Sequence, residues 1–258
     1  MSDGNARTDW AVVTGASEGI GRAVADALAD AGYAVVAIAR NLKRLHSLAE
    51  GIESQGGRCL TIACDLSDPD AVSAACAQIL DGCGVPAVLV NIAGVGGFGE
   101  LDDYDHDQMD APFQVPVRAT MQLCHALSRP MSNAGGGSIV TVVTPAAYFP
   151  LPFMAPYTAS RWALLGFTEA LGEELHGTGV HVGVVCPGEV RTDYLHRNGS
   201  DIGWFPRISR AFPALEPDDV ATRILTVIRR KRREAIFPAV LWWFVKTYRL
   251  APRTTIAL

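Results

Sequence analysis

Short apolar runs and longer amphipathic stretches alternate along this chain from end to end. The apolar runs predict strands at residues 10–13, 35–39, 58–63, 87–90, 138–143, 180–185 and 235–237. The stretches between them predict helices at residues 22–29, 41–54, from 68 onward, 105–131, 156–176 and 218–233. Short apolar strands that alternate with helices indicate a parallel sheet with helices on both faces.

This order of elements predicts a fold of the α/β class, a doubly wound Rossmann fold with a mostly parallel seven-stranded sheet. We find no internal repeat, low-complexity segment or linker, so residues 1–258 are expected to form a single domain. Residues 239–258 form a divergent aromatic and basic tail. In such folds, ligands bind beyond the carboxyl ends of the strands.

Composition narrows the classes of function. The chain has 258 residues, 49% of them hydrophobic, and a formal net charge of −5. This charge argues against a nucleic-acid-binding domain. The first nine residues are polar and lack the apolar region of a secretory signal, and no window is long enough to span a bilayer. A cytoplasmic protein is therefore expected.

The cysteines give no sign of a metal site. None belongs to a Cys-x-x-Cys pair, and none has a histidine at metal-ligand spacing. We expect them to be small buried side chains in a reducing compartment. The six residues are Cys59, Cys64, Cys76, Cys83, Cys124 and Cys186.

The most informative segment lies between the first strand and the first helix. It is Thr14-Gly15-Ala16-Ser17-Glu18-Gly19-Ile20-Gly21. A strand, a glycine-rich turn and a helix bring a dinucleotide pyrophosphate onto the helix N-terminus, where free N–H groups and the helix dipole favour negative charge. Glycine is needed because a Cβ would block the approach of the phosphate.

With its elements placed, the chain resembles the short-chain dehydrogenase/reductase family from residue 10 to about residue 238. The glycine-rich turn is similar to the family's TGxxxGIG, and Asp65-Leu66 matches its acidic adenine-binding position. Asn91-Ile92-Ala93-Gly94 matches NxAG after the fourth strand. Tyr157 stands at the start of YxxxK, and Pro187-Gly188-Glu189-Val190-Arg191-Thr192 matches PGxVxT, which holds the nicotinamide end.

The resemblance implies both a cofactor site and a catalytic set. The catalytic residues would be Tyr157, Thr144 and Arg161. The cofactor would be bound by Gly15, Ser17, Glu18, Gly19, Ile20, Gly21, Arg40, Asp65, Leu66, Asn91, Ala93, Gly94, Tyr157, Arg161, Pro187, Gly188, Val190 and Thr192.

Arg40 predicts which nucleotide is bound. It follows the second strand directly, at the position that meets the adenosine ribose. A carboxylate there accepts the 2′-hydroxyl of NAD, whereas an arginine accommodates a 2′-phosphate. The guanidinium can also bind phosphate with two hydrogen bonds. We therefore expect NADP(H), with Lys43 and Arg44 as further positive charges. The alternative is that Arg40 is a solvated side chain near the start of a helix.

Three catalytic positions depart from the family pattern. Arg161 replaces the lysine that follows the tyrosine by four residues, and Thr144 replaces the serine that precedes it by thirteen. Pro116 falls at the position of the asparagine that anchors a water in the family's proton relay. Thr144 keeps a hydroxyl and Arg161 keeps a positive charge. Arginine does not give up a proton near neutral pH, and proline has no amide side chain, so the relay is expected to be broken.

Two hypotheses about the site follow. In the first, the protein is an NADP(H)-dependent oxidoreductase that interconverts a carbonyl and an alcohol, with Tyr157 as general acid or base and a modified proton path. In the second, the fold has a changed, non-redox role as a dehydratase, isomerase or cyclase, or as a ligand-binding protein. The retained cofactor motifs favour the first hypothesis.

The expected substrate is a hydrophobic small molecule. The apolar segment 148–154 precedes the tyrosine helix, and the stretch after Gly188 contributes Tyr194, Leu195, Ile202, Trp204 and Phe205. These side chains line a pocket, or they pack as core or interface. His196 and Arg197 could meet a polar group of the substrate, although the sequence assigns them no catalytic role.

Other partners are less well defined. Residues 229–233 are all basic and are expected to lie at a helix end. The aromatic tail beyond them is expected to cap the pocket or pack in an interface, with membrane contact as the less favoured alternative. The family resemblance implies a homodimer or homotetramer.

Overall fold

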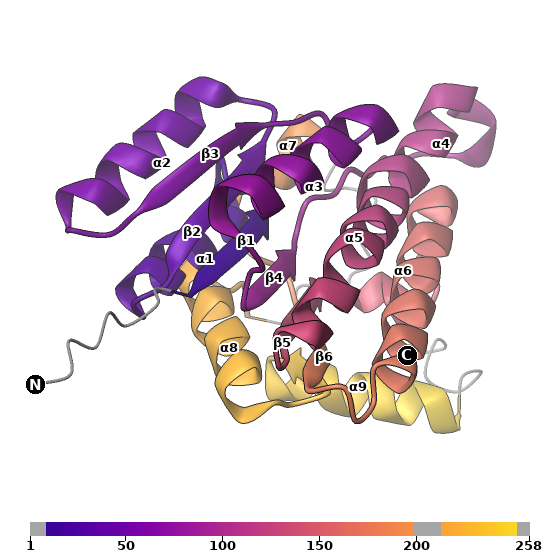
Figure 1. Ribbon diagram of the computed structural model, residues 1–258. Coiled ribbons are helices and arrows are strands. Elements are labelled where there is room, and N and C mark those ends of the chain that lie inside the picture. The colour runs from indigo at the N-terminus through magenta and orange to yellow at the C-terminus, as the bar shows by residue number, and fades with distance from the viewer. Residues whose placement is uncertain (1–8, 199–212, 252–258) are drawn as a thin grey trace, which may run out of the picture.

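The computed structural model describes residues 9–198 and 213–251, without the side chain of Leu195. In this part of the chain a sheet forms the middle layer of a three-layer sandwich, with helices on both faces (Figure 1). The predicted doubly wound Rossmann fold is confirmed. The strands are β1 (Trp10–Thr14), β2 (Ala34–Ala39), β3 (Cys59–Ala63), β4 (Val88–Asn91), β5 (Gly137–Val142), β6 (Val180–Pro187) and β7 (Glu234–Phe237).

The sheet has the order β3-β2-β1-β4-β5-β6-β7. Every neighbouring pair is parallel, so the seven described strands form an entirely parallel sheet. The chain moves outward from β1 to β3 and then returns to the other side of β1 at β4. The order therefore reverses between β1 and β4, and ligands of such folds bind at the carboxyl ends of the strands near this point.

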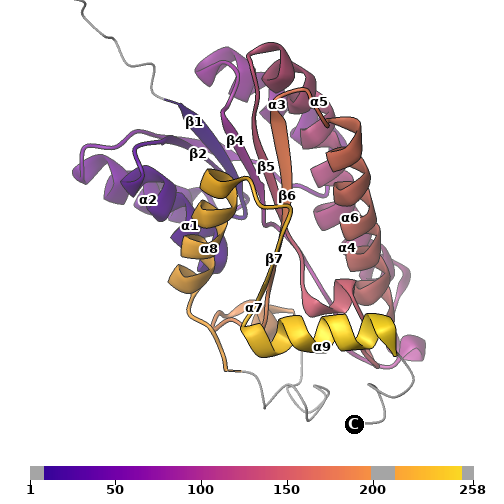
Figure 2. The same ribbon diagram turned by 90° about the horizontal axis from the view of Figure 1, so that it is seen from below.

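Each face of the sheet is covered by its own helices (Figure 2). On one face lie α1 (Gly19–Asp30), α2 (Leu42–Ser54) and α8 (Pro217–Arg230). On the other lie α3 (Pro69–Cys83), α4 (His106–Phe113), α5 (Ala119–Asn133) and α6 (Ala155–Glu174). Leu28, Leu45 and Ile224 pack on the first face, and Ile79 and Leu127 on the second. Burial of these side chains from helices and strands alike supplies the main driving force for the fold.

The predicted helix at residues 105–131 is divided. It consists of α4, the π-helical segment η2 (Gln114–Arg118) and α5. Pro116 lies in η2 and is buried, and it has no N–H to donate to an α-helical ladder. A π-helical turn tolerates this interruption and lets the chain continue in the same direction.

The prediction of a helix at residues 218–233 is wrong at its C-terminal end. α8 stops at Arg230 because Lys231 adopts a left-handed conformation with φ 48°. The Lys231 and Arg232 N–H groups donate back to the Ile228 and Val227 carbonyls and so satisfy the helix end. Only part of the basic run therefore lies in the helix.

The C-terminal tail contains a helix, α9 (Ala239–Leu250), which lies beside β7 (Figure 2). Leu241 and Val245 are buried, and the Phe149 and Phe244 rings meet edge to face at 5.0 Å. Its cations also turn toward the body of the protein. Lys246 pairs with Glu234, and the Arg249 guanidinium lies over the Tyr148 ring. No helix in the described part of the chain is long and apolar enough to cross a membrane.

All six cysteines are unpaired thiols. Cys64, Cys76, Cys124 and Cys186 are buried, and the other two are partly buried. Burial raises the pKa of each thiol, which keeps the thiols protonated and unreactive near neutral pH.

Candidate active site

A cleft of about 780 Å³ lies at the carboxyl ends of the strands. It is lined by the glycine-rich turn, the end of β2, the loops after β4 and β5, the start of α6 and the segment after β6. Every residue predicted to bind cofactor or to act in catalysis lines this cleft, apart from Asn91. Segments far apart in the sequence are therefore brought to one edge of the sheet.

The glycine-rich turn contacts its neighbours too closely to admit side chains. Gly15 and Gly19 have φ of 69° and 52°, in the left-handed region that favours glycine. A Cβ on Gly21 would lie 2.1 Å from the Gly15 carbonyl oxygen. The free backbone of this turn opens onto the cleft at the start of α1, the arrangement that suits a pyrophosphate.

Thr14 holds this turn against the loop after β4. Its Oγ1 accepts hydrogen bonds from the Ile92 N–H at 2.9 Å and the Ala93 N–H at 3.1 Å. The sequence analysis quoted Thr14 as part of the motif but gave it no role. Its position as the last residue of the first strand was the signal that could have identified it.

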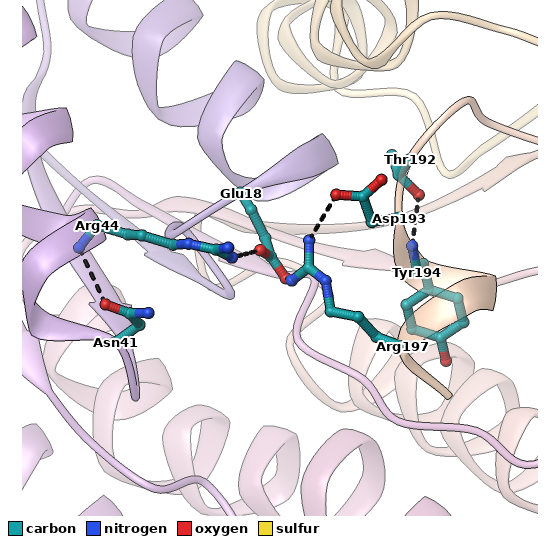
Figure 3. Close-up of polar contacts among 7 residues, drawn as sticks. All are labelled: Glu18, Asn41, Arg44, Thr192, Asp193, Tyr194 and Arg197. Carbon is teal, nitrogen blue, oxygen red and sulfur yellow. Dashed lines mark hydrogen bonds and ion pairs between the residues drawn. The ribbon is translucent and has the colours of Figure 1, made fainter. Parts of the chain in front are cut away.

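Glu18 lies between two arginines from different elements (Figure 3). It pairs with Arg44 of α2 and with Arg197 of α7 (Tyr194–Arg197), a short helix that the sequence analysis did not predict. Arg197 also pairs with Asp193 at 3.2 Å. These groups are partly exposed, so the pairs add little stability. They do neutralise the Glu18 carboxylate, which would otherwise repel a bound phosphate.

Arg40 and Asp65, which are predicted to bind the adenosine part of the cofactor, both line the cleft. Arg40 is exposed directly after β2 and lines the cleft. Asp65 Oδ1 accepts hydrogen bonds from the Ser67 N–H at 2.9 Å and the Ser67 hydroxyl at 2.8 Å. These bonds, followed by the positive charge of Arg40, lower the pKa of Asp65 against a small effect of burial. The carboxylate is thus held ionised near the exposed Arg40 guanidinium.

Tyr157 lies at the other end of the cleft, near the start of α6. Its side chain is 6% exposed and its ring centroid is 5.6 Å from that of Phe98. The Arg161 guanidinium carbon lies 4.5 Å from the centre of the Tyr157 ring, in cation–π contact. The positive charge that the sequence placed one helical turn after the tyrosine therefore stacks on the tyrosine itself.

Arg161 is 4% exposed and has defined partners. Its Nη2 donates to the Val95 carbonyl at 3.0 Å and to the Tyr194 hydroxyl at 3.3 Å. Burial acts to lower the pKa of the guanidinium, but the phenolic groups of Tyr157 and Tyr194 outweigh it, so the pKa of Arg161 is raised. Arg161 is therefore a fixed positive charge in the cleft and not a proton donor.

Thr144 uses its side chain to cap the turn after β5. Its Oγ1 accepts a hydrogen bond from the Ala146 N–H at 3.2 Å, at the start of η3 (Pro145–Ala147). A hydroxyl that accepts one bond still has its own proton to donate. Thr144 also lines the cleft, so that proton is available to a ligand oxygen.

Asn91 is placed differently from the expectation. It is 3% exposed at the end of β4, and its Nδ2 lies 3.8 Å from the Cys124 sulfur of α5. Among the described residues its Oδ1 has no hydrogen-bond partner. The Asn91 side chain thus contacts α5, and its contact with the cofactor stays a prediction.

The end of the cleft near Tyr157 is largely apolar. Phe98, Phe149, Leu151, Met154 and Leu241 line it. Tyr148, which was expected to line the pocket, instead donates its hydroxyl to Glu234 at 3.0 Å. Leu241 comes from α9, so the aromatic tail contributes to the pocket wall. Of the predicted lining residues, Ile202, Trp204 and Phe205 lie outside the described residues.

This chain is similar to known proteins that are described as dehydrogenases. A family model described as short chain dehydrogenase matches residues 9–203. A short chain dehydrogenase of Pseudocercospora fijiensis is 37% identical over 185 residues, which are 71% of this chain but only 60% of that relative. A 3beta-hydroxysteroid dehydrogenase of Mediterraneibacter gnavus is 35% identical over 198 residues, 74% of this chain and 69% of the relative.

A solved structure gives the same result. It is a metagenomic short-chain oxidoreductase in complex with NADP, with a TM-score of 0.75 and 34% sequence identity. The match covers 89% of this chain and 96% of that one.

Proposed function

This chain belongs to the short-chain dehydrogenase family, and on this premise we propose that it is an NADP(H)-dependent oxidoreductase that interconverts a carbonyl and an alcohol on a hydrophobic small molecule. One observation carries the proposal: Tyr157, Thr144 and Arg161 line the same cleft as the glycine-rich turn. A nucleotide bound along this turn would have its reactive end beside a phenol, a hydroxyl and a fixed positive charge.

The residues of the cleft fit NADP(H). The backbone of the glycine-rich turn would hold the pyrophosphate, and the turn keeps its shape because a Cβ on Gly21 would collide with the Gly15 carbonyl. Arg40, exposed and lining the cleft, would bind the 2′-phosphate. Related structures were solved with NADP or NADPH bound, which supports the same assignment.

The chemistry divides between cofactor and protein. When bound, the reduced cofactor supplies the hydride. Thr144 donates a hydrogen bond to the carbonyl oxygen, and Tyr157 gives that oxygen a proton as it becomes an alkoxide. Arg161 lies on the Tyr157 ring and stabilises the negative charge left on the phenol. In the direction of alcohol oxidation, the same groups act in reverse.

The alternative is a non-redox role. Pro116 and Arg161 favour it, because neither can take part in the water-mediated relay of the family. Dehydration, isomerisation or ligand binding would use the same apolar cleft without hydride transfer. Nucleotide binding and nucleotide-dependent turnover separate the two roles.

The first experiment is a fluorescence titration of the purified protein with NADPH and, separately, with NADH. Tight binding of NADPH and much weaker binding of NADH are expected. NADPH oxidation is then followed with acetophenone, cyclohexanone and long-chain methyl ketones. Tyr157→Phe should abolish turnover while NADPH still binds. If neither nucleotide binds, or if a reaction continues without one, the non-redox role takes its place.

Self-association belongs to the same proposal. Phe113, Met121 and Trp162 are large apolar side chains, each 40–50% exposed, on α4, α5 and α6. A homodimer or homotetramer that packs through these helices would cover them. Light scattering measures the mass directly, and a monomer at micromolar concentration would contradict the assembly.

A further inference from the structure

The short helix α7 places a second phenol in the cleft beside Tyr157. Tyr194 is the first residue of α7, and its hydroxyl accepts the hydrogen bond from Arg161 at 3.3 Å. Arg161 in turn lies against the Tyr157 ring. The two tyrosines, which are 37 positions apart in the sequence, therefore share one buried guanidinium.

The backbone at Gly96 shows how closely the two phenols approach. A Cβ at this position would lie 2.6 Å from Cδ2 of Tyr157 and 3.1 Å from the Tyr194 hydroxyl oxygen. Both side chains thus converge on one glycine. The absence of a side chain at Gly96 allows Tyr157, Tyr194 and Arg161 to pack together.

Other contacts hold α7 in this position. Arg197, at the far end of the helix, pairs with Glu18 of the glycine-rich turn (Figure 3). Asn198 accepts a hydrogen bond from the Gly96 N–H at 3.3 Å and donates to the Tyr194 carbonyl at 2.7 Å. α7 is therefore attached both to the loop after β4 and to the start of α1, which keeps Tyr194 at Arg161.

The electrostatic surroundings of Tyr194 suit a proton carrier. Burial and then the neighbouring Tyr157 raise the pKa of Tyr194, whereas Arg161 lowers it. Tyr194 therefore carries its proton at neutral pH, and a positive charge stands ready to stabilise the phenolate that forms when the proton leaves. Because the Tyr194 hydroxyl accepts from Arg161, its own O–H remains available to donate.

We propose that Tyr194 is a second proton-transferring residue of this active site, which returns a proton to Tyr157 in place of the lysine–asparagine relay that this chain lacks. The inference rests on the proposed oxidoreductase function. It assigns a catalytic task to a residue of the segment after β6 that otherwise only lines the pocket.

The proton steps balance as follows. In carbonyl reduction the Tyr157 O–H bond breaks and a new O–H bond forms on the substrate alkoxide. The Tyr194 O–H bond then breaks as that of Tyr157 forms again. The Tyr194 phenolate finally takes a proton from solvent that enters the cleft, which Tyr194 lines. The single proton consumed in each turnover thus comes from water, and Arg161 stabilises each phenolate while it lasts.

The test compares the wild type with Tyr194→Phe and with Tyr104→Phe as a matched control. Tyr104 has a buried phenol hydroxyl that does not line the cleft. Both variants should bind NADPH like the wild type in the fluorescence titration. With the best-reduced ketone of the panel, Tyr194→Phe should lower kcat by about tenfold or more, since general acid–base catalysis typically contributes 10²–10⁴-fold. Tyr104→Phe should leave kcat unchanged.

Chemical rescue separates proton transfer from packing. At constant pH and ionic strength, rising imidazole concentration should increase kcat of Tyr194→Phe and leave the wild type and Tyr104→Phe unaffected. A Tyr194→Phe variant that keeps the wild-type kcat would overturn the inference. So would a slow variant that imidazole does not restore, or one that no longer binds NADPH.

A readout without substrate tests the location of the hydroxyl. Absorbance of the tyrosine phenolates is followed from neutral to alkaline pH in the wild type and in Tyr194→Phe. Because the pKa of Tyr194 is raised, Tyr194 should not titrate near the ordinary tyrosine pKa of about 10. The number of phenols that titrate near this pKa should therefore be the same in the wild type and in Tyr194→Phe. A smaller number of these phenols in Tyr194→Phe would place Tyr194 in solvent. This result would overturn the role of Tyr194 and leave the proposed function untouched. A wild type that reduces no ketone would instead overturn the proposed function, and the relay with it.

Discussion

At the scale of single residues, Arg161 shows how one substitution changes the demands on its neighbours. Its Nη2 bonds the Val95 carbonyl and the Tyr194 hydroxyl and its guanidinium lies on the face of Tyr157, whereas its Nε has no hydrogen-bond partner among the described residues. An unpaired charge at 4% exposure would be strongly destabilising. The side chain therefore belongs to a connected polar group and not to a damaged motif.

Substitutions of Arg161 should distinguish its charge from its shape. Arg161→Met removes the charge and leaves the Val95 carbonyl unpaired, and we expect it to lower kcat by about tenfold or more and to cost about 1–3 kcal/mol of stability. Arg161→Lys keeps the charge but cannot stack in the same way or bond both the Val95 carbonyl and the Tyr194 hydroxyl. Its kcat and its stability should therefore lie between those of the wild type and those of Arg161→Met. Ketone reduction and urea denaturation measure these effects. Equal activity of wild type and Arg161→Met would show that the charge has no role.

Arg40 is predicted to select the nucleotide. Arg40→Asp replaces the expected phosphate partner by a carboxylate that accepts a ribose hydroxyl, so NADPH should bind at least about tenfold more weakly and NADH more tightly. Fluorescence titration with both nucleotides gives the ratio of the two Kd values. Arg129→Asp, the same charge change at an exposed position on α5 away from the cleft, is the control. An unchanged ratio in Arg40→Asp would make Arg40 a solvated side chain.

At the scale of elements, α9 and α7 complete the cleft from outside the family motifs. α9 contributes Leu241 to the cleft wall, and its aromatic contacts with Phe149 fix the loop after β5. α7 carries Tyr194 and Arg197 to opposite parts of the cleft. Two helices whose sequences resemble no motif thus contribute side chains to the cleft.

Packing of α9 gives a prediction about stability and substrate choice. Leu241 is 1% exposed, so Leu241→Ala should cost about 2–5 kcal/mol and enlarge the apolar end of the cleft. Bulkier ketones should then gain in kcat/KM relative to smaller ones. Trp243→Ala, at 64% exposure on the same helix, should change stability by less than about 0.5 kcal/mol. Chemical denaturation and the ketone panel provide the measurements, and equal losses for the two variants would contradict the packing of α9.

At the scale of the whole molecule, the cleft and a histidine that couples stability to pH lie at opposite ends of the strands. The cleft occupies the carboxyl ends of the strands, whereas His181 lies on β6 near its opposite end. Burial, together with the charges of Lys231 and Arg233, lowers the pKa of His181. This histidine therefore links global stability to pH without touching the active site.

The sign of this linkage follows from proton binding. In the unfolded chain His181 takes up a proton near its ordinary pKa of about 6.5, but in the folded protein it does so only at lower pH. The unfolded state thus binds more protons in this window, and stability decreases as pH falls from about 6.5 toward the folded pKa. His181→Gln should reduce this decrease in urea denaturation series between about pH 7 and pH 5. His46→Gln, at an exposed position of α2, is the control and should leave the decrease intact.

Much of the element order was predictable because helices and strands of this fold carry different periodicities. The seven strands lie within a residue or two of their predicted positions. The predictions failed where local backbone chemistry overrode the pattern. A π-helical turn that contains Pro116 divides one predicted helix, and Lys231 ends α8 early in a left-handed conformation. Neither the π-helical turn nor the left-handed residue changes the spacing of hydrophobic residues in the sequence.

The site was predictable wherever a motif fixes the backbone. Gly15, Gly19 and Gly21 stand where only glycine fits, so the sequence alone located the nucleotide turn. The contacts of Thr14, Tyr194 and Arg197 were not predicted, because each acts through a partner at least 33 residues away. The contact of the Asn91 side chain with Cys124 was not predicted, since its motif does not reveal which way the side chain points.

The sequence by itself determined the fold, the nucleotide turn, the order of the landmarks and the replacements at the catalytic positions. Hydrophobic periodicity and glycine spacing are local properties, so they can be read from the sequence without knowledge of the tertiary contacts. Only the tertiary structure decided that Arg161 stacks on Tyr157, that Tyr194 reaches it from α7 and that Leu241 closes the apolar end of the cleft. These contacts join residues distant in the sequence, and their geometry depends on how the whole chain packs around the sheet.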